Sequence, residues 1–103
     1  MIETVTRKRI EILVDTPLVP LVIRHVKAAD ISGWSVLHVD RGGGRDAEWQ
    51  HDEVTGASAK AIVLVIAGEA KASALVESLA PILDSHRLFL AVGEVEVVRG
   101  DRY

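Results

Sequence analysis

The chain has 103 residues, a formal net charge of -3, 49% hydrophobic residues and no cysteine. This length predicts a single domain over residues 1–103, and the acidic balance argues against nucleic-acid binding. Without cysteine the chain has no disulfides and no thiolate metal sites. No long apolar run follows the charged residues at the start, so we expect neither a signal peptide nor a membrane span, and a cytoplasmic location.

The first half of the sequence predicts a strand, a helix and a second strand. Polar and apolar residues alternate over 9–14, as in a strand. Pro17 suits the first turn of a helix, and apolar residues recur at helical spacing from there to about residue 30. Residues 34–39 are rich in β-favouring side chains. The segment 40–59 shows neither the helical nor the strand periodicity of apolar residues, and long loops of this kind are usually functional or disordered.

The second half repeats this order of elements. Residues 61–67 form a continuous apolar run, typical of a strand covered on both faces. Residues 69–83 carry an apolar stripe at helical spacing. Residues 87–98 are extended, and we expect Gly93 to mark a bulge there. The order β-α-β, loop, β-α-β predicts an α+β, ferredoxin-like fold, with two helices on one face of an antiparallel sheet.

The apolar strand at 61–67 also predicts self-association. Two helices cover only one face of such a sheet, yet both alternating sets of side chains in this strand are apolar. A contiguous exposed apolar patch is rare in soluble monomers. We therefore expect copies of the chain to associate through the face without helices; the alternative is that one set of side chains is only half buried.

Four short features, taken in this order, resemble the PII signal-transduction superfamily, and its PII-like branch more than the nitrogen regulators proper. They are Gly33-Trp34-Ser35-Val36 opening the second strand, Gly42-Gly43-Gly44-Arg45 entering the long segment, Lys60 before the apolar strand, and Arg99-Gly100-Asp101-Arg102 near the end. The resemblance covers nearly the whole chain. It implies a homotrimer that binds adenine nucleotides in clefts between subunits and signals to a target protein through a T-loop at about 40–59.

The resemblance also implies roles for individual residues. Gly33, Trp34 and Ser35 would line the adenine, and Gly44 and Arg45 would lie near the phosphates. The basic residues for the phosphate charge would be Lys60, Arg87, Arg99 and Arg102. Glycine lets backbone N–H groups approach an anion, and arginine offers a bidentate fork. The alternatives are a core or interface position for Trp34, a hinge or turn for the glycines, and a solvated charge for Arg45.

Departures from the nitrogen regulators narrow the expected ligands. Asp46 stands where those proteins carry a glutamine used for 2-oxoglutarate, so that ligand is disfavoured. A glycine-rich phosphate loop is missing from 83–87, so ADP or AMP fits at least as well as ATP. Shortened PII-like relatives include proteins tied to inorganic-carbon uptake. Gly43, Gly44 and Arg45 would then supply a site for bicarbonate as a second ligand.

The long segment carries the remaining candidates. Trp49 is an aromatic side chain in a polar segment, so it is a candidate anchor for the target protein, for which a transporter is one option; packing against the loop base is the alternative. His51, Asp52 and Glu53 are metal-ligand types, but consecutive residues of an extended chain point apart, so we expect no metal site. No catalytic arrangement or cofactor motif is readable. The competing hypothesis is a metal-responsive ferredoxin-like trimer of the divalent-cation-tolerance type.

Overall fold

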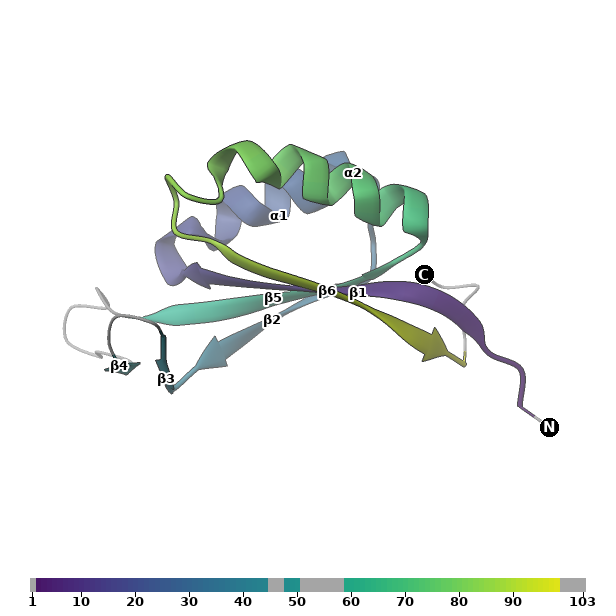
Figure 1. Cartoon of the computed structure of the whole chain (residues 1–103), viewed down its shortest axis with the longest axis horizontal. Helices are drawn as coiled ribbons and strands as arrows, with labels where there is room; N and C mark the ends of the chain where they lie inside the picture. Colours follow the sequence, from purple (N-terminus) through teal and green to yellow (C-terminus); the bar gives the residue numbers. More distant parts are fainter. Residues whose placement is uncertain (1, 45–47, 51–58, 99–103) are drawn as a thin grey trace.

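The computed structural model describes residues 2–44, 48–50 and 59–98, with only the backbone at 48–50. In this part of the chain, two helices lie on one face of a four-stranded sheet (Figure 1). The strands of that sheet are β1 (Val5–Asp15), β2 (Trp34–Val39), β5 (Lys60–Ala67) and β6 (Phe89–Val97). The helices are α1 (Val19–Ala28) and α2 (Glu69–Leu79), flanked by the 3-10 turns η1 (Thr16–Leu18) and η2 (Ala80–Ile82). None of the described helices is long and apolar enough to cross a membrane.

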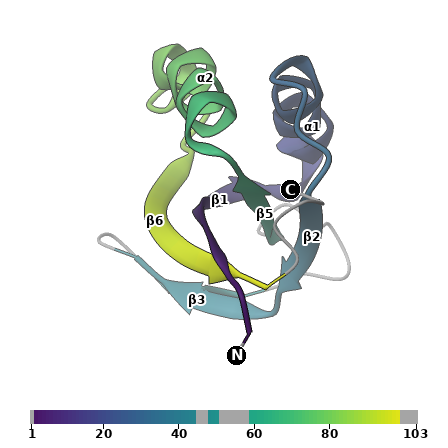
Figure 2. The same cartoon turned by 90° about the vertical axis from the view of Figure 1, so that its right-hand side faces the viewer.

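The sheet has the strand order β2-β5-β1-β6, and every neighbouring pair is antiparallel. This arrangement confirms the ferredoxin-like α+β fold predicted from the order of elements. The central strands β5 and β1 come from different halves of the chain, so each half contributes one inner and one edge strand. Figure 2 shows α1 and α2 side by side above the same face of the sheet.

The core lies between the helices and this covered face. Every second residue of β1 and of β5 points into it, and the helices contribute one buried stripe each. The fully buried larger side chains are Ile10, Ile12, Val14, Val22, Val26, Val63, Val65, Leu75 and Leu79. Burial of such a side chain stabilises the fold by roughly 1.5–3 kcal/mol before the entropy cost. This core therefore fixes β1 and β5, on which the candidate site depends.

The opposite face of the sheet is open. One row of facing residues runs across all four strands there, from Leu37 on β2 through Ile62 and Leu13 to Phe89 on β6. Leu37 is 46% exposed and Phe89 is 64% exposed. The apolar set of β5 on this face, Ile62, Leu64 and Ile66, is half-buried in the single chain, which is the alternative that the sequence left open.

Two expectations about local structure were wrong. Within the segment predicted to lack regular structure, β3 (Arg41–Gly43) pairs with β4 (Glu48–Gln50) as a two-stranded antiparallel sheet. The glycine-rich sequence of β3 carries no apolar alternation, so periodicity could not indicate this backbone pairing. Gly93 does not mark a bulge, since it faces Arg9 in an unbroken β1–β6 register.

Candidate functional site

The residues predicted to hold a nucleotide lie at two ends of the sheet. Gly33 and Trp34 enter β2 beside the end of β5, where Trp34 faces Val65. At the other end, β2 finishes at Val39, which faces Lys60 at the start of β5. The five steps from Trp34 to Val39 span about 17 Å at the usual strand rise. The strand β2 thus connects the predicted adenine end to the predicted phosphate end.

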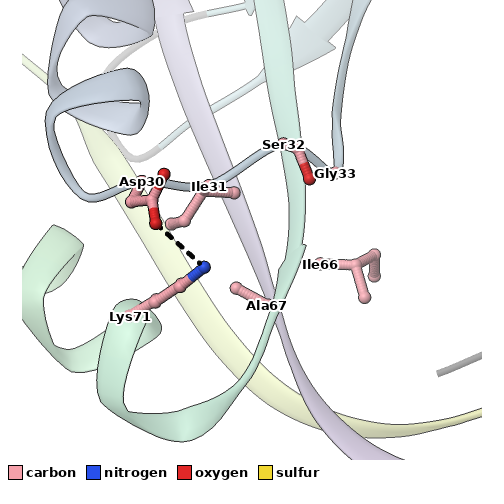
Figure 3. A pocket seen from close by; sticks show the side chains of 7 residues that line it. All are labelled: Asp30, Ile31, Ser32, Gly33, Ile66, Ala67 and Lys71. Carbon is pink, nitrogen blue, oxygen red and sulfur yellow. Dashed lines mark ion pairs between the residues drawn. The ribbon is translucent and has the colours of Figure 1, made fainter. Parts of the chain in front are cut away.

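At the predicted adenine end, a turn carries the chain from α1 to β2. Asp30 adopts a left-handed backbone (φ 59°), which aspartate tolerates better than most residues. The carbonyl of Gly33 accepts a hydrogen bond from the amide of Ile66 at 2.9 Å, which ties the turn to β5. The Lys71 ammonium lies 3.4 Å from the Asp30 carboxylate (Figure 3). These contacts fix the backbone just before β2.

A small cavity opens at this turn (Figure 3). Its lining residues are Asp30, Ile31, Ser32, Gly33, Ile66, Ala67 and Lys71. Its volume of about 20 Å³ is close to the minimum for one water molecule. This cavity alone is therefore too small for an adenine ring, and a base placed here needs a second surface to cover it.

Trp34 is half-buried and packs against the core on the helix side of the sheet. The Lys27 ammonium lies 6.0 Å from the centroid of its ring, at the outer limit of a cation–π contact. Ser35, the next residue, is exposed. The core position that the sequence left as an alternative for the tryptophan side chain is thus present. A contact with a base through the backbone of this edge strand is compatible with that position.

At the predicted phosphate end, Lys60 is held by an ion pair that sequence reasoning missed. Its ammonium lies 2.6 Å from the Asp15 carboxylate, and the two side chains are 20% and 35% exposed. The amide of Thr16 donates to the carbonyl of Ala59 at 3.0 Å. The end of β1 and the start of β5 are therefore joined by both a charge pair and a backbone hydrogen bond. Only the β1–β5 register reveals this pair, because the two residues are 45 positions apart.

Asp15 changes the electrostatics expected around Lys60. A carboxylate at this distance offsets much of the lysine charge, so any phosphate bound at Lys60 would have to compete with it. The hydroxyl of Thr16 is buried and has no hydrogen-bond partner among the described residues. Such groups are uncommon in folded proteins, where buried polar atoms are usually paired. The base of the long segment thus combines a cation, a carboxylate and a buried hydroxyl.

The predicted glycine and tryptophan contributors lie in or beside the β3–β4 hairpin. Gly43 faces Glu48, and Gly44, which follows β3, is exposed. Trp49 faces Gly42 through the backbone. Three predicted anion-binding arginines, Arg45, Arg99 and Arg102, lie outside the described residues, as do His51, Asp52 and Glu53. In the described part of the chain, no three histidine or acidic side chains gather as a metal site would require.

Arg87 lies on the far side of the sheet from β2. It ends the turn after α2 with a left-handed backbone (φ 53°), and its amide donates to the carbonyl of Asp84 at 3.2 Å. It precedes β6, the edge strand opposite β2. Three strand spacings, about 14 Å, separate these two edges. Within one chain, Arg87 and Gly33 therefore belong to different edges and different ends of the sheet.

The sequence matches the family model for nitrogen regulatory protein P-II over residues 7–102. The chain belongs to the P-II family. This membership agrees with the superfamily indicated by the glycine, lysine and arginine motifs. No curated protein sequence matches the chain.

Solved structures give the same fold for this P-II family member. CPII, a nitrogen regulatory PII-like protein of Thiomonas intermedia solved with ADP, AMP and bicarbonate, superimposes with a TM-score of 0.88. It is 17% identical, and the match covers 99% of this chain and 97% of that chain. A PII-like signaling protein of Thermus thermophilus gives a TM-score of 0.82 at 22% identity, with 98% of each chain covered. The apo form of CPII superimposes with a TM-score of 0.74 at 15% identity, and the match covers 94% of this chain and 97% of that chain.

Proposed function

We propose that this P-II family protein is a non-catalytic sensor that binds adenine nucleotides in clefts between the subunits of a homotrimer. The observation that carries the proposal is the position of Gly33 and Arg87 on opposite edges of one sheet. Arg87 precedes the end of β6 that lies level with Lys60, so a ring of copies that brings the β2 edge of one subunit to the β6 edge of the next would add Arg87 to the predicted phosphate end. The small cavity at Gly33 supports this interpretation, since a base seated there needs a second surface over it.

The open sheet face supports the assembly. The row from Leu37 to Phe89 is apolar on all four strands, and its ends are 46% and 64% exposed in the single chain. Burying apolar surface contributes about 25 cal/mol per Å². Inward-facing sheets in a trimer would remove this row from water.

We propose ADP and AMP as the principal nucleotides, with ATP a further ligand and bicarbonate a second ligand. CPII, whose fold this chain shares, was solved with ADP, AMP and bicarbonate. Lys60, Arg87 and the arginines at 45, 99 and 102 would balance the phosphate charge. Gly43, Gly44 and Arg45 would offer backbone N–H groups and a guanidinium to bicarbonate.

We further propose that the segment 40–59 passes ligand binding on to a target protein in inorganic-carbon metabolism, for which a transporter is a candidate. Its two ends meet where Val39 faces Lys60, whose ammonium pairs with Asp15, so an anion that draws Lys60 away from Asp15 would loosen the base of the segment. Trp49 would anchor the segment on the target, because tryptophan is enriched at binding hot spots.

The proposal is tested by measuring mass in solution and binding heats for ADP, AMP and ATP, each with and without bicarbonate. We expect a trimer that binds at least one adenine nucleotide without turning it over. Nucleotide at a hundredfold excess over Kd stabilises the folded state by about 2.7 kcal/mol. A monomer, or a trimer with no heat and no thermal shift from any nucleotide, would refute the proposal. Stabilisation by a divalent metal alone would instead favour the divalent-cation-tolerance type.

A further inference from the structure

A groove of about 380 Å³ lies on the helix side of the sheet, between α2 and the strands β1 and β6. Figure 2 shows α2 above the β6 side of the sheet, so the groove lies at the opposite edge from the small cavity at Gly33. Its volume is within the range of known ligand pockets, about 300–1,000 Å³. Its lining residues are Lys8, Glu69, Ala72, Ser73, Val76, Glu77 and Val92, and none of them belongs to the proposed nucleotide or bicarbonate sites.

One stripe of α2 forms the helical wall of this groove. Glu69, Ser73 and Glu77 recur every four residues with Val76 beside them, so they share a face of the helix. Glu69 and Glu77 are two turns apart, about 12 Å along the axis. On the strand side, Val92 is 49% exposed. The groove therefore carries a carboxylate at each end and apolar side chains between them.

The cation that lines the groove is already paired. The Lys8 ammonium lies 2.9 Å from the Glu94 carboxylate, and the lysine side chain is 26% exposed. This hydrogen bond raises the pKa of Lys8, and the charge of Glu69 raises it further. Lys8 thus stays charged, and Glu94 offsets its charge. The remaining charges in the groove, Glu69 and Glu77, are both negative, so the groove attracts cations and repels anions.

Glu77 occupies an unfavourable place in its helix. It lies in the last turn of α2, where the helix dipole disfavours a carboxylate and favours a cation. No basic residue occupies that turn, and within the described part of the chain no side chain forms an ion pair with Glu77. Residues that break a local preference are expected at functional positions. A cation brought by a binding partner would relieve this unfavourable charge.

We propose that the groove binds an extended basic segment of a partner protein, in which an apolar side chain lies between two lysines or arginines. Alternate residues of an extended chain point to the same side, so residues i, i+2 and i+4 face the groove and span about 13 Å. The two cations would then reach Glu69 and Glu77, and the apolar side chain would pack on Val76 and Val92. A helix is about 10–12 Å across, too wide for this volume. This docking surface is separate from the segment 40–59 and goes beyond the proposed function.

The first test is an NMR titration of the isotope-labelled protein with the capped peptide Lys-Thr-Leu-Thr-Lys, and Glu-Thr-Leu-Thr-Glu is the control peptide. We expect the basic peptide alone to shift the amide signals of α2 and Val92, and high salt to abolish the effect. Glu77→Gln should weaken binding roughly two- to fivefold, which corresponds to one exposed ion pair. The matched control Asp84→Asn removes the same charge beyond the end of α2 and should leave the affinity unchanged.

A charge swap supplies a second test. The double variant Glu69→Lys/Glu77→Lys should bind the acidic peptide and lose the basic one. Both residues are exposed, so the swap leaves the core intact. ADP titration of the same samples tests the proposed function separately, because a failure to bind ADP would leave the groove unaffected.

Four results would overturn this inference: no shift with the basic peptide, equal binding of the two peptides, shifts confined to residues outside the groove, or unchanged affinity in Glu77→Gln. Spermidine is a further control. If it shifts the same amides at least as strongly as the peptide, the groove takes a free amine and not a protein segment. If Glu77→Gln loses the assembly state of the wild type, a neighbouring copy fills the groove instead.

Discussion

Replacing Asp15 by asparagine should tighten ADP binding, while replacing Lys60 by methionine should weaken it. The Lys60 ammonium and the Asp15 carboxylate are 2.6 Å apart and only partly exposed. If Lys60 contacts a phosphate, the carboxylate both competes for the lysine and repels the ligand. Two unit charges about 6 Å apart at an effective dielectric of 20 interact by about 2.8 kcal/mol, which is an upper bound. We expect roughly tenfold tighter binding for Asp15→Asn.

Lys60→Met should lower ADP affinity by roughly tenfold or more, and both variants should lose stability. An exposed ion pair contributes up to about 1 kcal/mol and a fully buried one costs about 3–5 kcal/mol when broken. Because the burial of this pair is intermediate, we expect each variant to lose about 1–2 kcal/mol of unfolding free energy. This corresponds to a fall in Tm of roughly 4–16 °C for a domain of this size. Calorimetric titration with ADP and thermal unfolding at one fixed protein concentration measure both effects.

The control for net charge is Lys8→Met, at the other end of β1. It removes the same charge far from the loop base, so ADP affinity should stay within about twofold of the wild type. A lowered Tm with an unchanged ADP affinity for Lys60→Met would contradict a phosphate contact at Lys60. Lys60 would then be a structural residue that joins β1 to β5 and contacts no phosphate. An unchanged or weaker affinity for Asp15→Asn would equally refute the proposed competition.

Three further predictions concern the charge pair at Lys8, the core and the tryptophan signal. The hydrogen bond to Glu94 raises the pKa of Lys8 above its ordinary value of 10.5. The pair therefore stabilises the fold below pH 10.5, and this contribution is lost as the pH rises through the raised pKa. Glu94→Gln should flatten the fall of Tm with pH above 10.5, and an unchanged slope would contradict this. Leu75→Ala should cost about 3 kcal/mol in urea unfolding because Leu75 is fully buried, and a loss below about 1 kcal/mol would refute tight packing there. In a Trp49→Phe background, ADP should change the fluorescence of Trp34; a flat titration in a protein that binds ADP by calorimetry would place the base elsewhere.

The sequence carried enough information to predict the fold because hydrophobic burial determines most of its elements. The apolar run at 61–67 became β5, and the alternation at 9–14 became the inner part of β1. The outer part of β1 was missed because it extends past the core, where residues such as Lys8 pair with charged neighbours. The β3–β4 hairpin was missed because backbone pairing leaves no periodic pattern in a glycine-rich segment.

The candidate site was less accessible to sequence reasoning. Family motifs indicated Gly33 and Lys60 as candidates, but the pairing of Lys60 with Asp15 depends on a register that joins distant parts of the chain. The separation of Gly33 and Arg87 on opposite edges depends on strand order, which the motifs do not contain. Charge partners and edge positions are properties of the folded sheet, so they can be identified only once the strand order and register are known.

The central place of β1 in the sheet also bears on how the protein is made. One edge of β1 pairs with β5 and the other edge pairs with β6. Leu13, for example, faces Ile62 of β5 and Phe89 of β6, and both lie much later in the chain. During synthesis from the N-terminus, β1 therefore leaves the ribosome long before either partner strand exists. The edge of β1 that pairs with β6 therefore stays without its partner strand until β6 has been made, so the four-stranded sheet is completed only late in synthesis.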